Sequence, residues 1–280
     1  FEQPFLQYIR VGADGKLKQL EGIELPEMVM MHDFNITENY VIFMDLPLAF
    51  DLDLLASGIP FRFKRENQAR LGVMPRTGSA SDIRWFEINP CYVFHQVNAW
   101  EQGDVITLFV SKQDSAFGAD SGDFSEVSRL HRWQINLATG QVTEEKVDDR
   151  PGDFGRVNDR FVGQPSQFGY LMALDGEGNS EEPIYGPKLY QYNLASGHCN
   201  EHLLGDGTRG AEPVYAQVPS SEAENDGWVL CLVHNEHKNK SKLVIIDADN
   251  FSAAPVASIE LPYPVPYGAH GNWIADQDLI

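Results

Sequence analysis

Cysteine is scarce in this 280-residue sequence, which has only three. Cys91, Cys199 and Cys231 are widely spaced and odd in number, and no two of them form a C-x-x-C pair. The paired cysteines that zinc binding or dithiol redox chemistry needs are therefore missing. We expect a reducing, cytoplasmic setting for the protein.

Positive charge is also in short supply. The sequence has 21 Lys and Arg residues against 41 Asp and Glu residues, a formal net charge of -20, and no local basic cluster offsets it. A surface of this kind repels phosphate backbones, so nucleic acid is excluded as a partner. The pattern favours a neutral or apolar small-molecule substrate.

Long apolar runs are the third absence. No stretch approaches the roughly 18 residues of a membrane span, and no basic segment followed by an apolar one marks a signal peptide. The run LPLAFDLDLLASGIPFRF, residues 46–63, has two interpretations. It is either an exposed apolar loop that makes a peripheral membrane contact to take up lipid-soluble substrate, or a buried strand and turn.

The sequence does have a repeated pattern of strand, tight turn and strand. Its best examples are FLQYIRVGADGKLKQLEGIEL, HRWQINLATGQVTEEKVDD, KLYQYNLASGHCNEHLL and KLVIIDADNFSAAPVASIEL. Each predicts a β-hairpin, and FRFKRENQARLGV, residues 61–73, predicts a weaker one. Helical periodicity is hard to find, so the expected fold class is all-β.

The spacing of the hairpins narrows the fold to a β-propeller. Their turns fall near Gly15, Gly140, Gly197 and Asn250, at intervals of 125, 57 and 53 residues, the first being about twice the others. A period in the fifties suits a four-stranded propeller blade. The 280 residues would then make about five blades, fewer than many closed propellers have. Together with the strand-like opening at Phe1, this favours a missing N-terminal portion over a complete small propeller.

Three of the eight histidines have an unusual context. His32, His95 and His270 each lie among apolar or small residues near the end of a predicted strand. Because a propeller brings strand ends together on its axis, residues this far apart in sequence can meet there. Spacing alone leaves the trio a weak metal-site candidate, since it matches no local ligand motif. The pairs His198/His202 and His234/His237 lie in polar turns, where we expect solvated side chains.

The segments around these histidines resemble one family. MMHDFNITENYVIFMDLPLAFDL, RWFEINPCYVFHQVNAWE, GDFGRVNDRFVG, AEPVYAQ and LPYPVPYGAHGNWI occur in the order typical of the carotenoid cleavage oxygenases. That family includes carotenoid and apocarotenoid oxygenases, the retinal-pigment-epithelium isomerase and the stilbene-cleaving dioxygenases. The resemblance spans nearly the whole chain.

The resemblance implies a seven-bladed propeller that holds one ferrous iron, Fe(2+), on its axis with four histidines. The second, third and fourth ligands would be His32, His95 and His270, and the first would lie upstream of Phe1. Residues 1–280 would then be a single-domain, partial propeller that lacks the N-terminal blades and the first ligand. Imidazole nitrogens suit Fe(II), so the ligand set fits the metal.

The resemblance also implies carboxylates that orient the ligands from behind, as second-shell partners usually do. Asp153 would serve the third histidine and Glu212 the fourth. Asp153 departs from the family pattern, because the family usually has Glu-Phe-Pro where this chain has Asp153-Phe154-Gly155. The shorter side chain must reach its histidine through a shifted backbone or a water.

Two further groups lie near the ligands in the sequence. Asp33 is expected to make structural hydrogen bonds rather than act as a general base, because in this chemistry the reactive work belongs to iron and O2. The aromatic residues Phe34, Phe94 and Trp273 either line an apolar tunnel or pack in the core.

The function that the resemblance implies is a non-haem Fe(II) dioxygenase, an oxidoreductase that uses O2 to split a conjugated C=C bond into two carbonyl products. A carotenoid or apocarotenoid is the preferred substrate, because MDLPLAFDL resembles that branch. The alternatives are a stilbene-cleaving dioxygenase, an isomerase on the same iron site, and a propeller that binds partners without catalysis.

Overall fold

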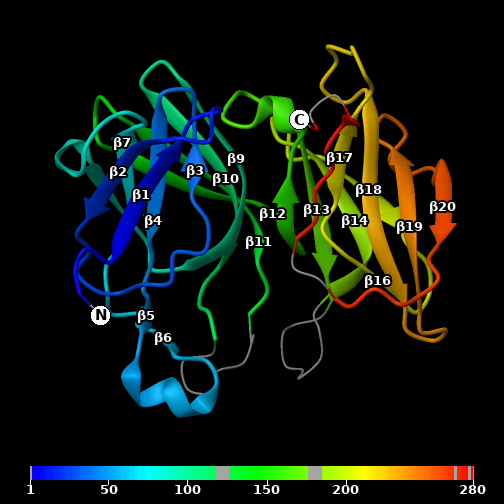
Figure 1. The fold of residues 1–280 in the computed structure, drawn as a ribbon, viewed down its shortest axis with the longest axis horizontal. Coiled ribbons are helices and arrows are strands. Elements are labelled where there is room, and N and C mark those ends of the chain that lie inside the picture. Colours follow the sequence, from blue (N-terminus) through cyan, green and yellow to red (C-terminus); the bar gives the residue numbers. More distant parts are fainter. Residues whose placement is uncertain (1, 118–125, 176–184, 268–269, 277–278, 280) are drawn as a thin grey trace.

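Strands dominate the structure (Figure 1). The computed structural model describes residues 2–117, 126–175, 185–267, 270–276 and 279, which form twenty strands and three short 3-10 helices. Within these residues, no helix is long and apolar enough to cross a membrane. The all-β class predicted from the sequence is confirmed.

The N-terminal part contains a hairpin, a four-stranded sheet and a smaller strand pair. The bounds are β1 (Leu6–Val11), β2 (Leu17–Ile23), β3 (Asn35–Ile36), β4 (Tyr40–Asp45), β5 (Leu48–Phe50), η1 (Leu52–Ser57), β6 (Phe61–Phe63), β7 (Ala69–Pro75), η2 (Ala80–Asp82) and β8 (Arg84–Ile88). The sheet order is β3-β4-β7-β8. Five of the six residues of β4 are buried, which explains its continuous apolar run. A strand covered on both faces has no polar side to alternate with.

The central part is a seven-stranded sheet in the order β15-β14-β13-β12-β11-β10-β9. The bounds are β9 (Tyr92–Gln102), β10 (Val105–Gln113), β11 (Arg129–Asn136), β12 (Val142–Arg156), η3 (Asp159–Phe161), β13 (Phe168–Leu174), β14 (Tyr185–Asn193) and β15 (Cys199–Leu203). The long strand β12 pairs with β11 mainly through its first half and with β13 through its second half. It therefore closes one four-stranded unit and opens the next.

The C-terminal part is a sheet whose innermost strand is interrupted. The bounds are β16 (Thr208–Gly210), β17 (Val214–Gln217), β18 (Gly227–Asn235), β19 (Lys240–Asp247) and β20 (Ala257–Glu260). Both β16 and β17 pair with β18, and the chain between them is not in the ladder. After β20 the described residues form no further strand and lead back toward the centre of the molecule, as the red segment in Figure 1 shows.

These sheets are propeller blades. Four-stranded antiparallel units are the blade pattern of a β-propeller. The sheet β3-β4-β7-β8 is one such unit, the seven-stranded sheet is two units that share β12, and the C-terminal sheet is a fourth whose innermost strand is split into β16 and β17. The described residues contain four such blades and the hairpin β1–β2. The innermost strands are β3, β9, the second half of β12, and β16 with β17, so their ends are the places where distant residues can meet.

Four predicted hairpins are confirmed and the fifth is wrong. The pairs β1–β2, β11–β12, β14–β15 and β19–β20 are antiparallel as expected. Over residues 61–73, however, β6 pairs with β5, and β7 pairs with β4 and β8. The short helix η1 turns the chain back on itself, so β6 meets β5 first. The buried strand β7 then takes a central position between two partners.

Candidate metal centre

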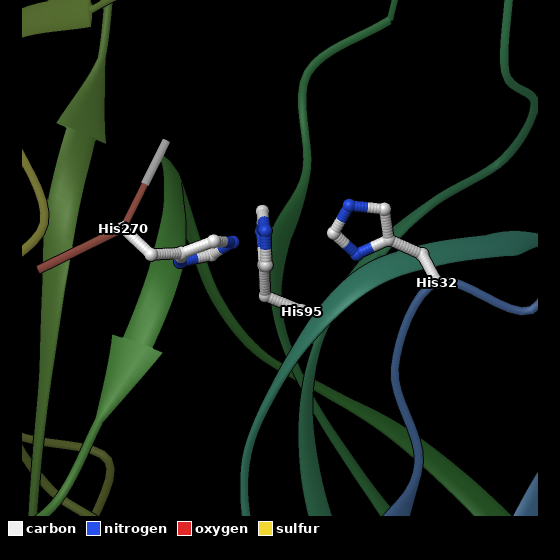
Figure 2. A group of neighbouring side chains, drawn as sticks. All are labelled: His32, His95 and His270. Carbon is white, nitrogen blue, oxygen red and sulfur yellow. The ribbon is translucent and has the colours of Figure 1, made fainter. Parts of the chain in front are cut away.

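His32, His95 and His270 lie side by side on the inner side of the sheets. His32 precedes β3, His95 lies in β9, and His270 lies in the segment after β20. One ring nitrogen from each can be chosen so that the three lie within 4.8 Å of one another. The ring centroids are 4.9 Å apart for His32 and His95, and 5.0 Å apart for His95 and His270. Figure 2 shows the rings converging on a common space.

Each of these rings is held at Nδ1 by an oxygen acceptor. His32 Nδ1 lies 2.9 Å from the carbonyl oxygen of Phe94. His95 Nδ1 lies 3.0 Å from Asp153 Oδ1, and His270 Nδ1 lies 3.2 Å from Glu212 Oε1. A carbonyl or an ionised carboxylate only accepts hydrogen bonds, so each Nδ1 carries the proton in the neutral ring. Each Nε2 then keeps its lone pair, which is the state that binds a metal.

Asp153 contacts His95 directly, despite being shorter than glutamate. It is buried, and its Oδ1 also accepts the backbone N–H of Phe154 at 2.8 Å. The pairing of β12 with β13 shifts register between Asp153 and Arg156, and Phe154 has a positive φ of 56°. The Asp153 carboxylate therefore reaches His95 by direct contact, from a strand whose register is shifted at this point.

Glu212 lies at the break between β16 and β17 and is buried. Its Oε1 accepts from His270, and its Oε2 accepts the backbone N–H of Gly271 at 2.8 Å. Arg156 approaches the same carboxylate at 3.5 Å and donates to the carbonyl oxygen of Gly271 at 3.3 Å. Glu212 thus binds the backbone N–H of Gly271, and Arg156 binds its carbonyl oxygen. Together these bonds fix the irregular segment that carries His270.

The electrostatic environment differs among the three rings. Desolvation lowers the pKa of His32, and the neighbouring His95 adds to the effect. For His95, burial works to lower the pKa, but the hydrogen bond and charge of Asp153, with Asp33 and Glu212 further away, outweigh it and raise the pKa. The acidic groups behind His95 therefore favour positive charge at this site, whether it comes from a proton or from a metal ion.

Asp33 makes the structural hydrogen bonds that its position suggested. Its Oδ1 accepts the backbone N–H of Phe34 at 2.8 Å, and its Oδ2 accepts that of Gln96 at 3.0 Å. The second bond joins the residue after His32 to the residue after His95. Asp33 therefore couples the two strand ends that carry these histidines.

Aromatic rings cover one side of the histidines. The ring in closest contact, that of Phe154, was not predicted from the sequence. Phe154 stacks on His95 with a centroid distance of 4.4 Å and lies 5.6 Å from His270. Phe94 contacts His32 edge-on at 5.5 Å and also packs against the core. Phe34 and Trp273 are about half exposed, and Trp273 lines an apolar cavity next to the site. The signal for Phe154 was its place next to Asp153.

Two cavities adjoin the centre and share Glu212 and His270. One, of about 350 Å³, is lined by all three histidines together with polar groups that include Asp33 and Arg156. The other, of about 310 Å³, is largely apolar. Its walls include Tyr185, Leu230, Leu243, Tyr267 and Trp273. The ring centroids of Tyr185 and Phe154 are 6.0 Å apart. Because Tyr185 lines the apolar cavity, this cavity begins beside the aromatic residues that cover the histidines.

The remaining histidines do not join this centre, but one expectation about them was wrong. His198 is exposed and His234 is half-buried beside Ser241 Oγ at 3.1 Å. His202 is buried, and its Nδ1 lies 2.8 Å from the carbonyl oxygen of Phe251. The turn looked polar in sequence, but β15 packs His202 beneath the turn that contains Phe251.

The sequence matches a known family over almost its whole length. Residues 1–275 match the family described as retinal pigment epithelial membrane protein. The chain belongs to this family. The similar proteins described next are named as carotenoid cleavage dioxygenases and related oxygenases. The resemblance seen in the histidine motifs is therefore confirmed.

Individual members of the family are similar to this chain. A carotenoid 9,10(9',10')-cleavage dioxygenase of Phaseolus vulgaris is 34% identical over 298 residues, covering 99% of this chain and 54% of the relative. Isoeugenol monooxygenase of Pseudomonas nitroreducens is 30% identical, covering 97% of this chain and 60% of the relative. The crystal structure of Pseudomonas brassicacearum lignostilbene dioxygenase superposes with a TM-score of 0.85 at 27% identity, covering 96% of this chain and 60% of that one.

These matches establish the family and its propeller fold for the residues described. They also give the relation in length: the chain spans about half the length of the carotenoid dioxygenase and three fifths of the other two proteins.

Proposed function

We propose that the protein acts as an Fe(II)-dependent oxygenase that cleaves a conjugated C=C bond with O2 to give two carbonyl products. The observation that carries this proposal is the convergence of three histidine nitrogens within 4.8 Å in a chain of the carotenoid oxygenase family. A carotenoid or apocarotenoid is the proposed substrate, in keeping with the names of several similar relatives.

The donor atoms fit a ferrous ion. His32, His95 and His270 would hold it through Nε2, because each Nδ1 is already engaged by an oxygen acceptor. Neutral imidazole is a suitable ligand for iron, and the carboxylates of Asp153 and Glu212 would offset the charge of the ion from behind the rings. When bound, iron would supply the activation of O2 that the protein side chains cannot provide.

The protein's own part in the reaction is to bind and orient the substrate. Phe94 and Phe154 offer flat apolar surfaces beside the ligand rings, and the apolar cavity beyond Tyr185 extends that surface. Its volume lies at the lower end of the range of small-ligand pockets, roughly 300 to 1,000 Å³. A conjugated chain lying against these rings would bring a double bond to the centre while water is kept from the aromatic side.

A partial propeller is the proposed domain organisation. Residues 1–280 would form a single domain with fewer blades than the seven that the family resemblance implies, and would supply three of the four implied histidine ligands. The support for this proposal is the coverage of only 54% of the carotenoid dioxygenase relative, together with the four blades and one hairpin of the described residues.

A peripheral membrane contact is the proposed route for uptake of an apolar substrate. The segment 46–63 combines the two interpretations given for it, because β5 is mostly buried whereas Leu52 and Leu55 of η1 are exposed. The 3-10 helix η1, which carries both leucines, is the light-blue coil that protrudes at the bottom of Figure 1. The cytoplasmic location expected from the sequence is part of the same proposal.

A phenolic stilbene or phenylpropene is the second candidate substrate. The observation that favours it is the similarity to isoeugenol monooxygenase and to lignostilbene dioxygenase. The fold and the histidines do not separate this candidate from a carotenoid, because both would use the same centre.

The test is to incubate the iron-loaded protein with an apocarotenal, and in parallel with a hydroxystilbene, under 18O2. The proposal expects two carbonyl products whose masses sum to that of the substrate plus one O2 molecule, with 18O label in the products. It also expects loss of activity in His95→Ala. The matched control is His198→Ala, which changes an exposed histidine outside the centre. A product of unchanged mass without O2 consumption would indicate an isomerase, and no product from either substrate would favour a binding module.

A further inference from the structure

Three consecutive residues of β12 contact His95 and the strand that carries it. Asp153 holds the ring edge at Nδ1, and Phe154 stacks on the ring face. Gly155 faces the backbone of β9 beyond His95. The position of this tripeptide relative to β9 therefore sets the orientation of the His95 ring.

The backbone of the tripeptide is irregular. Asp153 pairs with Met172 and Arg156 pairs with Tyr170, so three steps along β12 correspond to two steps along β13. The extra residue is a β-bulge, a feature that redirects side chains. Phe154 has a φ of 56°, which residues other than glycine rarely adopt, and its N–H bonds to Asp153 Oδ1. The bulge turns both Asp153 and Phe154 toward His95.

Gly155 allows β12 and β9 to approach unusually closely. A Cβ atom at position 155 would lie 2.5 Å from Val97 Cγ2, 3.0 Å from the carbonyl oxygen of Gln96 and 3.1 Å from Val97 Cα. Two of these atoms are backbone, and Val97 is a buried, β-branched residue that cannot easily rotate away. To restore an ordinary carbon–carbon contact of about 3.5 Å, the strands would have to separate by about 1 Å.

That distance is similar to the reach of one methylene group. A carbon–carbon bond is about 1.5 Å long, and glutamate exceeds aspartate by one such link. The resemblance to the carotenoid cleavage oxygenases implies Glu-Phe-Pro at these positions, with a longer carboxylate and a residue that carries a Cβ. This chain differs at both positions at once, having Asp153 and Gly155.

We propose that Asp153 and Gly155 are a matched pair, in which the missing side chain at position 155 brings β12 close enough to β9 for the shorter carboxylate to reach Nδ1 of His95. Asp153 is then a positioning residue for His95. That His95 binds a metal rests on the proposed function. Either residue alone should then be incompatible with the family's usual partner.

The test is a double-mutant cycle of Asp153→Glu, Gly155→Ala and the double variant. The first measurement uses the metal-free protein: 15N chemical shifts of the His95 ring report which nitrogen carries the proton. In the wild type we expect the proton on Nδ1.

Each single variant should show a mixture of tautomers. In Asp153→Glu the new side chain is too long for the close strands, and in Gly155→Ala the added methyl group moves the carboxylate of Asp153 away from the ring. In the double variant the longer carboxylate spans the wider gap, so we expect the wild-type tautomer to return.

The second measurement is the affinity for Co2+ as a spectroscopic probe of the site. Loss of an orienting partner typically weakens metal binding 10- to 100-fold, which we expect for each single variant. Independent losses would multiply in the double variant. The proposal instead expects the double variant to bind Co2+ more tightly than either single variant. The matched control is Asp149→Glu, a change to an exposed carboxylate that should leave both measurements unaltered.

Three results would overturn the pairing: losses that multiply in the double variant, a wild-type tautomer in Asp153→Glu alone, or a wild-type tautomer in Gly155→Ala alone. If Gly155→Ala does not fold, the comparison of Asp153→Glu with the double variant decides, because rescue by the second change is the signature of a matched pair. If no protein, the wild type included, binds Co2+, the proposed function fails, and the tautomer measurement still decides the pairing.

Discussion

At the level of single residues, the site depends on acceptors that fix the histidine tautomers. His32 uses a backbone carbonyl for this purpose, whereas His95 and His270 use buried carboxylates. A carboxylate both orients a ring and stabilises positive charge beside it. The two carboxylates are therefore expected to affect metal affinity in two ways, through the orientation of the rings and through their negative charge.

Glu212→Gln should separate these two effects. The glutamine side chain can still accept one hydrogen bond, from His270 or from Gly271, but it carries no charge and removes one anionic partner of Arg156. We expect metal affinity to fall by about 10- to 100-fold with little change in the fold, as measured by metal titration and circular dichroism. The control Glu222→Gln alters an exposed ion pair. Unchanged affinity in Glu212→Gln would contradict the role of the charge.

His202 should make stability depend on pH. Burial lowers the pKa of His202 below the ordinary value of about 6.5. The unfolded chain therefore binds the proton first as the pH falls. The stability contribution is complete above about pH 6.5 and is lost as the pH drops through the lower, folded-state pKa.

The variant His202→Asn should reduce the loss of stability between pH 7 and pH 5, measured as the free energy of unfolding in urea. Its Nδ2 can donate to the Phe251 carbonyl in place of Nδ1, so the hydrogen bond can be kept while the titrating group is removed. His198→Asn, in an exposed position, should leave the pH profile unchanged. An equally steep profile in His202→Asn would show that other groups cause the acid sensitivity.

The family resemblance predicted most residues of the candidate site and the pairing of Asp153 with His95 and of Glu212 with His270, but not the contacts of Phe154 and Arg156. His32, His95, His270, Asp153 and Glu212 were named because they fall on motif positions that resemble the family. Phe154 and Arg156 were not named. The contact of Phe154 with His95 depends on the bulge in β12, and that of Arg156 depends on the irregular segment around Gly271, which is distant in sequence. An aromatic residue or an arginine in a strand gives no such signal by itself.

At the level of elements, the functional residues lie where strand pairing is interrupted. Pairing of β9 with β10 shifts register around His95, β12 is bulged after Asp153, and Glu212 lies between β16 and β17. A regular strand sends alternate side chains to the blade faces, which are packed against neighbouring blades. An interruption can redirect a side chain toward the axis.

The sequence predicted the hairpins at the outer edges of the blades better than these inner strands. Gly15, Gly140 and Gly197 mark turns because their φ angles are positive, and that requirement can be recognised locally. The register of an inner strand depends on partners distant in sequence. The wrong hairpin over residues 61–73 had the same cause, since β7 has its partners in β4 and β8.

Gly72 tests the packing of a blade without touching the site. It lies opposite Trp85 in the pair β7–β8, and a Cβ atom at position 72 would lie 2.6 Å from the indole ring. Gly72→Ala must displace this ring, which also contacts Arg70. We expect a loss of about 1–3 kcal/mol in the free energy of unfolding, measured in urea. No loss would mean that Trp85 has room to move.

At the level of the whole molecule, the propeller serves to bring distant segments together. His32 and His270 are near opposite ends of the sequence, yet their ring centroids are 6.3 Å apart. The fold achieves this because successive blades place their inner strands around one axis. The hairpin spacing predicts an all-β protein with a repeat of propeller-blade length, and the family resemblance adds the number of blades and the common axis.

The central claim is that the three histidines bind one metal ion together. The most direct measurement is the iron content of the protein after anaerobic loading with Fe(II) and removal of excess metal. We predict about one iron per chain, and none above background after His95→Ala, with His198→Ala equal to the wild type. Iron that remains bound in His95→Ala, or a wild type that retains none, would contradict the claim.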